Sequence, residues 1–367
     1  MSQDIDLAVV GAGPAGSSAA EAAAAAGLSV WLIDKKSEIG SPVQCGGFLP
    51  EVGELEKLLP SAELPRALAD IPERIVLCRT SLQRIYSPSG SFKEFPVAGR
   101  VLDRRAFDRH LAHRAAIAGA RILPATRARL AEGQLQLSGR FGGAVRPRLI
   151  IGADGPHSMI SRAMGNPVQE TGICLEYEMV DVDIDPQAAE MYFSARYAPG
   201  GYAWIIPLGS DSANVGVGVR ATYLSGQRLP QILDRFIAEH PLAREKLAGG
   251  EAVAVMRGAV PAGGRPPAIM KDNLLLSGDA AGQVMATSGG GIPLAIVGGR
   301  IAGQAAAGYL RGKERLEDYP SRINRAFGVE LARSVQIRKI VDLAMKSDRL
   351  MNSLFSALSP SQMKSVM

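Results

Sequence analysis

The chain is poor in the residues that build disulfides and metal sites. Its 367 residues include three cysteines and four histidines. The cysteines (Cys45, Cys78 and Cys174) are an odd, scattered set, which excludes a disulfide framework and a C-x-x-C metal site and indicates a reducing compartment. Cys78 and Cys174 lie in strand patterns and are expected in the core. The histidines show no metal-ligand spacing, so we expect no metal and place them on helix surfaces or in turns: His110, His113, His157 and His240.

The sequence also lacks the signatures of a membrane span, a secretory signal and a nucleic-acid interface. No apolar run approaches the ~20 residues of a membrane helix. The N-terminus opens directly on a strand pattern, without the charged region of a signal peptide. The net charge of +5 is mild, and no Lys/Arg run has interleaved aromatics. We expect a cytoplasmic monomer that binds no nucleic acid. The positive charge would suit an acidic substrate or peripheral contact with the inner membrane face.

A dinucleotide-binding pattern opens the chain. Residues 6–10 (DLAVV) predict a buried strand, residues 17–26 a helix and residues 29–33 (SVWLI) a second strand that ends at Asp34. The segment 11–16 (GAGPAG) joins the first strand to the helix as G-x-G-x-x-G. Such a helix N-terminus favours a diphosphate, and the acid after the second strand accepts hydrogen bonds from ribose hydroxyls. Gly11 allows the tight turn, Gly13 lets the backbone approach a pyrophosphate, and Gly16 lets the helix pack on the strands.

The remaining patterns predict an α/β fold with a discontinuous Rossmann-like domain and an inserted antiparallel sheet. The loop 35–50 is long enough to be functional or disordered. We expect helices at 51–69 (broken at Pro60 and Pro65), 103–119, 229–240 and 292–310, a hairpin of 74–79 with 82–87, and strands at 121–137, 149–151, 173–184, 191–197, 201–206, 213–219, 251–260 and 273–277. The predicted domains are 1–165 plus 261–310 for the nucleotide, 166–260 for the substrate and a helical 311–367; residues 70–100 could belong to the substrate side.

Three further stretches resemble the aromatic-hydroxylase superfamily of flavoproteins. They are Arg104-x-x-Phe107-Asp108 at a helix start, 152–155 (GADG), and 276–281 (LSGDAA). In that superfamily the Asp of the third stretch contacts the ribityl chain, and the next helix directs its N-terminus at the flavin pyrimidine. Such a helix would stabilise the negative charge of reduced flavin. The glycine cluster 289–291 and Ile292 occupy that place here, so the resemblance implies FAD.

The closer resemblance is to archaeal geranylgeranyl reductases. The loop 38–47 (EIGSPVQCGG) is similar to their loop ending Pro-x-x-Cys-Gly, and 201–207 (GYAWIIP) is similar to their Tyr-x-Trp-x-Phe-Pro motif, with Ile206 at the Phe position. That family uses reduced FAD to saturate isolated double bonds of prenyl chains. The predicted cofactor-binding residues are Gly11, Gly13, Ala15, Gly16, Asp34, Lys35, Cys45, Gly46, Phe48, Arg104, Ala128, Asp154, Asp279, Gly291 and Ile292. The predicted catalytic residues are Cys45, Tyr202 and Trp204.

The resemblance implies a prenyl lipid or prenyl diphosphate as substrate, and three other functions stay open. Tyr202 and Trp204 alternate on a strand, so they face one side and could form an aromatic wall or belong to a sheet core. Cys45 could donate a proton, gate the flavin or pack beside it. Because halogenases carry a similar Trp-x-Trp-x-Ile-Pro stretch, a flavin monooxygenase or halogenase is one alternative. A non-catalytic flavoprotein is another. An electron-transfer flavoprotein is the third, but the iron–sulfur cluster of its relatives is excluded, because no cysteine follows Cys174. The sequence does not identify the electron donor: no second G-x-G-x-x-G is present for NADPH, so a ferredoxin and a transiently docking nicotinamide both stay open.

Overall fold

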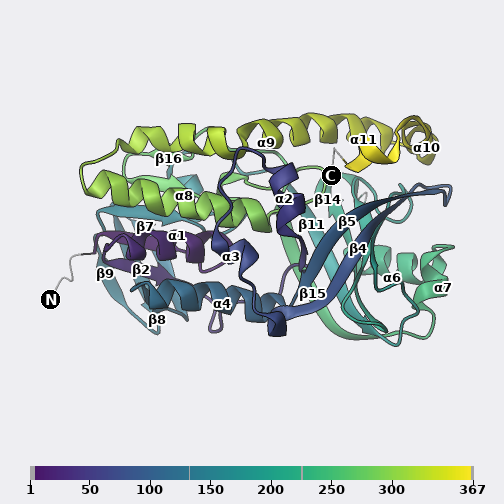
Figure 1. Ribbon diagram of the computed structural model, residues 1–367, viewed down its shortest axis with the longest axis horizontal. Helices are drawn as coiled ribbons and strands as arrows, with labels where there is room; N and C mark the ends of the chain where they lie inside the picture. Colours follow the sequence, from purple (N-terminus) through teal and green to yellow (C-terminus); the bar gives the residue numbers. More distant parts are fainter. Residues whose placement is uncertain (1–4, 132, 225, 365–367) are drawn as a thin grey trace.

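The fold comes from a computed structural model that describes residues 5–131, 133–224 and 226–364. In this part of the chain the strands form three sheets. A mostly parallel sheet lies at one end of an elongated molecule and a large curved sheet at the other, and a long C-terminal helix runs along the side of both (Figure 1).

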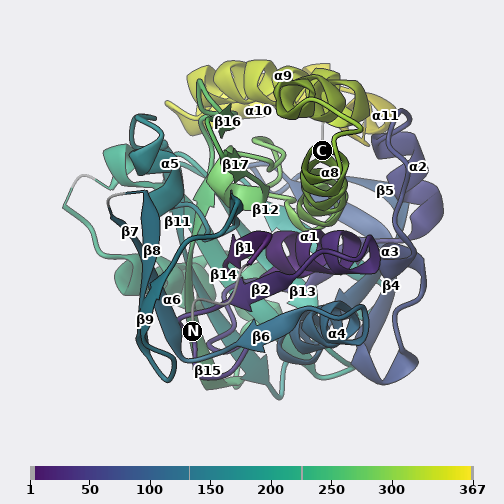
Figure 2. The ribbon, with the colours of Figure 1, turned by 90° about the vertical axis from the view of Figure 1, so that its left-hand side faces the viewer.

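The first sheet belongs to the nucleotide-binding end. Its spatial order is β16 (Met270–Lys271), β17 (Leu274–Leu276), β10 (Leu149–Gly152), β1 (Leu7–Val10), β2 (Val30–Ile33) and β6 (Arg121–Leu123), all parallel except β16. The continuous apolar run of β1 is buried on both faces, as a central parallel strand requires. Helices α1 (Pro14–Ala25), α4 (Arg104–Ile117) and α8 (Ile292–Leu310) cover one face. A small sheet of β7 (Thr126–Ala131), β8 (Gln134–Gly139) and β9 (Gly143–Val145) lies on the other side (Figure 2).

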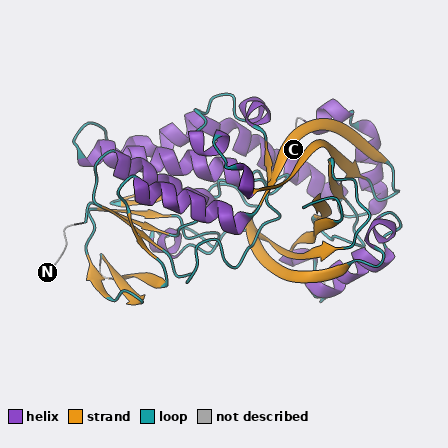
Figure 3. Cartoon of the chain, turned by 60° about the horizontal axis from the view of Figure 1, so that its bottom comes forward, coloured by secondary structure: helices purple, strands orange, loops and turns teal. Residues whose placement is uncertain are grey.

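The second sheet curves around the other end of the molecule (Figure 3). Its order is β15 (Glu251–Pro261), β11 (Thr171–Val180), β14 (Ser212–Arg220), β13 (Tyr202–Pro207), β12 (Ala188–Tyr192), β4 (Val76–Tyr86), β5 (Phe92–Leu102) and β3 (Phe48–Pro50). Neighbours are antiparallel except β12 and β4, which pair in parallel. Residues 48–102 therefore contribute strands to the same sheet as residues 171–261.

The hairpin predicted at 74–79 and 82–87 is wrong. Residues 76–86 form the single strand β4, which pairs along its length with β5. The turn expected between the two predicted strands lies within β4, where the pairing shifts register between Thr80 and Leu82. A β-bulge thus absorbs the irregularity that the sequence pattern assigned to a turn.

Helices cover the outer side of the second sheet and the side of the molecule. α6 (Leu229–Glu239) packs beside β11 and β14, and α7 (Ala243–Leu247) packs against α6. The helices α2 (Val52–Leu58), α3 (Arg66–Ala69) and α5 (Met159–Ala163) are short connections. The C-terminal helices are α9 (Tyr319–Ala344), α10 (Asp348–Ala357) and α11 (Pro360–Lys364). Phe355 and Met363 of the last two form a small core with Ile85 and Phe95 of β4 and β5. None of the described helices is both long and apolar enough to cross a bilayer.

Candidate functional site

A cavity of about 1590 Å³ connects the two ends of the molecule. Its lining begins at the carboxyl ends of β1, β2 and β10, where ligands bind in open α/β sheets. It continues between α8 and the inner face of the second sheet, and ends against α9, α10 and α11. Every residue predicted to bind cofactor or to act in catalysis lines this cavity, except Gly16.

The first part of the cavity is a cradle at the start of α1. Gly11 has φ +102°, and a Cβ on it would lie 2.2 Å from the carbonyl oxygen of Ala153. A Cβ on Gly16 would lie 1.8 Å from the carbonyl oxygen of Gly11, so this glycine faces the turn and not the cavity. Gly13 is the N-cap of α1 and has no side-chain cap, and a Cβ there would meet nothing within 4 Å. The helix therefore presents free backbone N–H groups and open space to an anion.

Asp34 completes this cradle at the end of β2. Its Oδ2 accepts a hydrogen bond from the backbone N–H of Ala12 at 2.7 Å, and its Oδ1 accepts one from the N–H of Lys36 at 2.8 Å. Both oxygens keep lone pairs that ribose hydroxyls can use. Lys35 and Ala128 line the same part of the cavity.

Asp154 and Arg104 border the middle of the cavity. Asp154 Oδ2 accepts from the N–H of Met159 at 2.8 Å, so this side chain caps the turn into α5, and burial raises the pKa of its carboxyl. Arg104 forms two hydrogen bonds of 3.1 Å with Asp108. Burial lowers the pKa of Arg104, but Asp108 and the nearby Cys45 sulfur raise it by more than burial lowers it. The net pKa is raised, so the guanidinium stays charged.

Asp279 and the start of α8 form the opposite wall. Gly291 is the N-cap of α8 without a side-chain cap, and a Cβ on Gly291 would lie 3.6 Å from Asp279 Oδ1. The carboxylate thus lies beside an open helix N-terminus that starts at Ile292. Burial raises the pKa of Asp279 to about 6, against the opposing field of Arg104.

The loop 35–47 is held in place at both ends, which gives this long connection a fixed position. Glu38 accepts two hydrogen bonds of 2.7 Å from Arg105 of α4, and Gln44 Nε2 donates to the carbonyl of Arg257 in β15 at 3.2 Å. Cys45 is half-buried, and its sulfur accepts from the N–H of Gly47 at 3.5 Å. Gly46 and, just beyond the loop, Phe48 line the cavity beside it.

Tyr202 and Trp204 lie on the inner face of the second sheet and both line the cavity, with ring centroids 5.8 Å apart. The Tyr202 hydroxyl donates to the carbonyl of Ser288, just before the glycine cluster. Trp204 Nε1 donates to Asn214 Oδ1 at 2.7 Å. The two aromatics therefore connect the sheet to the wall formed by the start of α8 and to a polar group on β14.

Three residues that the sequence analysis did not select also lie on this inner face: Cys174, Glu176 and Asn214. Asn214 Nδ2 donates to Glu176 Oε2 at 3.0 Å, and Glu176 is 2% exposed. Cys174 lines the cavity, so its expected place in the core is wrong, and burial raises the pKa of its thiol to about 12. Cys78 is also only half-buried, and its thiol donates to the carbonyl of Pro186 at 3.4 Å. No sequence signal separates Glu176 from a solvated strand residue, since Glu178 follows at the same period.

The far part of the cavity is apolar. Side chains from β4, β5 and β12 face side chains from the C-terminal helices across it, among them Ile85, Phe95, Met191, Val341, Met351 and Phe355. The C-terminal helices are tied to this end of the sheet. The N–H of Ala195 donates to Asp348 at 2.7 Å, and Lys93 donates to the carbonyl of Leu358.

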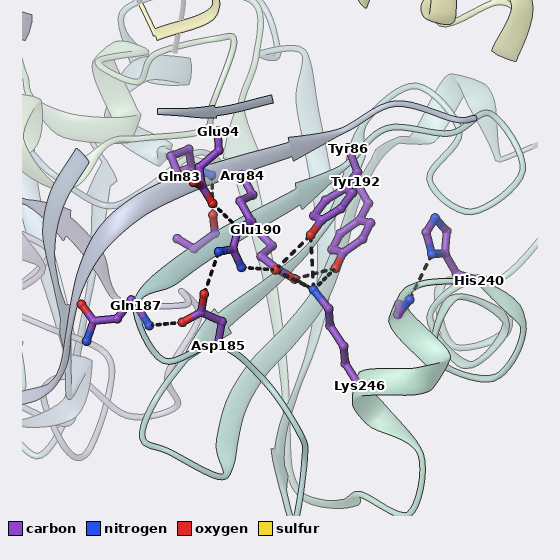
Figure 4. Close-up of polar contacts among 12 residues, drawn as sticks. Gln83, Arg84, Tyr86, Glu94, Asp185, Gln187, Glu190, Tyr192, His240 and Lys246 are labelled. Carbon is purple, nitrogen blue, oxygen red and sulfur yellow. Dashed lines mark hydrogen bonds and ion pairs between the residues drawn. The ribbon is translucent and has the colours of Figure 1, made fainter. Parts of the chain in front are cut away.

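A second polar cluster lies on the outer face of the same sheet (Figure 4). Glu190 is 3% exposed and accepts from Lys246 Nζ at 2.6 and 2.7 Å and from the Tyr192 hydroxyl at 2.5 Å. His240 lies in the turn after α6, which is one of the positions predicted for the histidines, but it is buried beside this cluster and not on the surface. Burial first, and then the Lys246 charge, lower the pKa of His240 to about 4.

The residues of the cavity fit FAD. The open helix N-terminus at Gly13, with Asp34 beside it, suits the adenosine diphosphate half. A second open helix N-terminus at Gly291, an acid at 279 and a charged Arg104 surround a separate part of the same cavity, which suits the ribityl chain and the flavin ring. The open backbone at Gly13 and the absence of a side-chain cap on either of these two described helices are the observations behind this fit.

The fold and the cavity define a dinucleotide-binding protein whose cofactor cleft opens into an apolar channel. The family model of the geranylgeranyl reductase catalytic domain matches residues 170–260, and that of an NAD(P)-binding Rossmann-like domain matches residues 9–46. The chain is 37% identical to digeranylgeranylglycerophospholipid reductase 2 of Methanopyrus kandleri, over 97% of this chain and 90% of that protein. It is 34% identical to digeranylgeranylglycerophospholipid reductase of Methanocella arvoryzae, over 96% and 90%.

Solved structures agree with these relatives. A geranylgeranyl bacteriochlorophyll reductase-like protein from Thermoplasma acidophilum has a TM-score of 0.82 and 30% identity, covering 96% of this chain and 90% of that one. A flavin-dependent brominase has a TM-score of 0.74 at 18% identity, over 96% of this chain and 93% of its own, which shows a shared fold alone. The chain belongs to the geranylgeranyl reductase family.

Proposed function

We propose that the protein is an FAD-dependent reductase that saturates isolated C=C bonds of geranylgeranyl or related prenyl chains. The substrate would be a lipid, such as an archaeal-type ether lipid precursor, or a prenyl diphosphate. The observation that carries this proposal is the continuity of one cavity from the dinucleotide cradle to the apolar channel under α9–α11. Membership of the geranylgeranyl reductase family supports the same reaction.

The geometry of the chain suits an unactivated substrate. Reduced FAD supplies the hydride when it is bound. An isolated alkene has no carbonyl group to stabilise charge, so the protein must position the chain and exclude water. The apolar side chains of the channel bury a prenyl chain, and Tyr202 and Trp204 form a wall next to the predicted flavin site. Their sheet positions hold both rings in a fixed orientation.

The direct test is an anaerobic turnover. The FAD-loaded protein is reduced with dithionite and mixed with a geranylgeranyl glycerolipid or with geranylgeranyl diphosphate. We expect reoxidation of the flavin and a mass gain of two hydrogens for each bond reduced. Unchanged substrate mass with both substrates would contradict the proposal, and oxygen-dependent consumption of NADPH would favour a monooxygenase or halogenase instead.

Cys45 gives a more specific prediction. Its sulfur lies near Arg104 in the loop that borders the predicted flavin site. We expect Cys45→Ala to retain FAD but to slow turnover by about tenfold or more, because the loop loses this contact beside the ring. The bound FAD is measured by absorbance and turnover by the anaerobic assay. Wild-type turnover in this variant would remove Cys45 from the mechanism.

A further inference from the structure

Glu176 is a buried acid in the wall of the cavity whose carboxyl group has a neutral partner. Its side chain is 2% exposed, and Oε2 accepts from the amide of Asn214 at 3.0 Å. Among the described residues no group donates to Oε1, and no lysine or arginine forms an ion pair with Glu176. The residue lines the cavity and shares the inner face of the sheet with Trp204, so this free oxygen is the part of the carboxyl group available to a bound molecule.

The register of the sheet places Glu176 next to the aromatic wall. Glu176 pairs across β14 with Gly216, and Gly216 pairs with Trp204 of β13. The Trp204 indole N–H and the Glu176 carboxyl group share Asn214 as their hydrogen-bond partner. The loop passes close to this amide, since a Cβ on Gly46 would lie 3.0 Å from Asn214 Oδ1. The acid is thus held at a defined position between the channel and the predicted flavin site.

Glu176 shares the reaction chamber with several other ionisable groups. Ionisable groups reach this region from β11, β13, the loop 35–47, α4 and the segment before α8: Cys174, Tyr202, Cys45, Arg104 and Asp279. Met256 of β15 is its other cross-strand neighbour. Burial raises the pKa of Glu176 to about 7, although the Asn214 bond and Arg104 oppose this rise. The raised pKa keeps the protonated form of Glu176 populated toward neutral pH.

The other candidate acids on the sheet are weaker or already engaged. The pKa of the Cys174 thiol is raised to about 12, mainly by burial. Burial also raises the pKa of Tyr202, and its hydroxyl proton is donated to the carbonyl of Ser288. A general acid works best when its pKa is near the operating pH, which favours the carboxyl group over both.

We propose that Glu176 is the proton donor of the reduction, delivering its proton from Oε1 to the alkene carbon that does not receive the hydride. The assignment rests on the proposed reductase function and names a residue for its proton-transfer half. The π bond breaks as one carbon gains the hydride supplied by reduced FAD and the other gains the proton of the Glu176 O–H. The alkene is reduced, the cofactor is oxidised, and Glu176 is left as a carboxylate that Asn214 stabilises and that water reprotonates.

The experiment compares Glu176→Gln with wild type in anaerobic single turnovers with a geranylgeranyl glycerolipid between about pH 5 and 9. We expect wild-type flavin reoxidation to slow as pH rises through about 7, because the donor loses its proton. Glu176→Gln should be slower by about 100-fold or more and should lack this pH dependence, with its FAD content unchanged. Glu176→Asp should keep part of the rate and the same pH limb, since it still carries an acid.

Glu178→Gln is the matched control. Glu178 lies on the same strand and the same face but does not line the cavity, so this variant should behave as wild type. Infrared spectra supply a readout independent of turnover: the carbonyl band of a protonated carboxyl group should titrate near pH 7 in wild type and be absent in Glu176→Gln.

The outcomes separate the two proposals. Wild-type rates and pH profile in Glu176→Gln would overturn the role of Glu176 while the reductase function stands. If the decrease in rate near pH 7 disappears in Cys45→Ala but persists in Glu176→Gln, the proton comes from Cys45, and the role proposed for Glu176 is overturned in that case too. A wild-type protein that reduces no prenyl substrate would refute the reductase function, and the proton donor with it.

Discussion

Two glutamates of one sheet are almost equally buried and have opposite surroundings. Glu176 on β11 is 2% exposed and Glu190 on β12 is 3% exposed. Glu190 pairs across the strands with Ile205, and Glu176 is aligned through Gly216 with the adjacent Trp204, so the two side chains leave opposite faces of the sheet. Glu190 contacts two cations, Lys246 and Arg84, and the hydroxyls of Tyr86 and Tyr192. The carboxyl group of Glu176 has one hydrogen-bond partner, the neutral amide of Asn214, and it leaves the face of the sheet that lines the cavity.

The difference shows how a partner decides what a buried carboxyl group can do. A buried carboxyl group with cations and hydroxyls around it has its oxygens engaged, and it connects the elements that carry those groups. Here Glu190 joins β12, β4 and α7. A carboxyl group without a paired cation favours its neutral form, and it can release a proton to a ligand. We therefore interpret the outer cluster as structural and the inner one as chemical.

The largest expected effect is on the structural side. Lys246→Met leaves Glu190 buried without its closest cation, and breaking such a pair costs about 3 kcal/mol of unfolding free energy. Arg84 at 3.5 Å and Tyr192 keep the cost at the lower end of the usual range. Urea denaturation at a fixed FAD concentration measures the change. Lys57→Met is the control, because Lys57 is 70% exposed in its pair with Glu54 and should change stability by less than about 1 kcal/mol. Equal losses in both variants would contradict the comparison.

Glu176→Gln should change stability in the opposite direction. An acid whose pKa is higher in the folded than in the unfolded state favours folding while it is protonated. Its full contribution to stability is present below the unfolded-state pKa, and this contribution is lost as the pH rises through the folded-state pKa. For Glu176 the window lies between 4.5 and about 7. Each pKa unit corresponds to about 1.36 kcal/mol, so the upper limit is about 3 kcal/mol. We expect the glutamine variant to gain about 2 kcal/mol over wild type across this window, because water in the cavity partly solvates the charge.

Denaturation curves of both proteins near pH 5 and near pH 8 check this prediction. The gap between them should grow with pH for Glu176→Gln and stay constant for Glu178→Gln, whose side chain does not line the cavity. A gap that shrinks toward pH 8 would mean that the folded protein prefers the Glu176 carboxylate, and the comparison with Glu190 would fail.

The sequence predicted the parts of the site that depend on local structure. The turn at Gly11, the helix from Pro14 and the acid at Asp34 lie within one βαβ unit, so short-range patterns suffice. The cap of α4 by Asp103 and the start of α8 at Gly291 also depend only on residues close together in the chain, so the sequence predicts them in the same way. These elements place the cofactor half of the cavity, and the family resemblance added the loop with Cys45.

The inner face of the second sheet could not be predicted in the same way. A strand that lines a cavity alternates polar and apolar residues just as a strand facing solvent does, so Glu176 and Glu178 look equivalent in ICLEYEMV. Asn214 of β14 lies opposite Glu178 in the register but donates its hydrogen bond to Glu176, and this contact between residues far apart in the chain is what separates them. The buried His240 was missed for the same reason, because Tyr192 and Phe236 enclose it from two elements.

The smallest expected effect compares two tyrosines on the opposite faces. Tyr192→Phe removes the 2.5 Å hydrogen bond to the Glu190 carboxylate and should cost about 1.5 kcal/mol of unfolding free energy, with FAD affinity unchanged. Tyr202→Phe loses a bond to the carbonyl of Ser288, which borders the cavity and can be solvated, so stability should fall by less than about 1 kcal/mol. The segment before Gly291 is then less fixed, and FAD affinity should weaken severalfold. Urea denaturation and FAD titration of both variants measure the two effects. Weaker FAD binding in Tyr192→Phe, or unchanged binding in Tyr202→Phe, would show that the two faces are not separate in function.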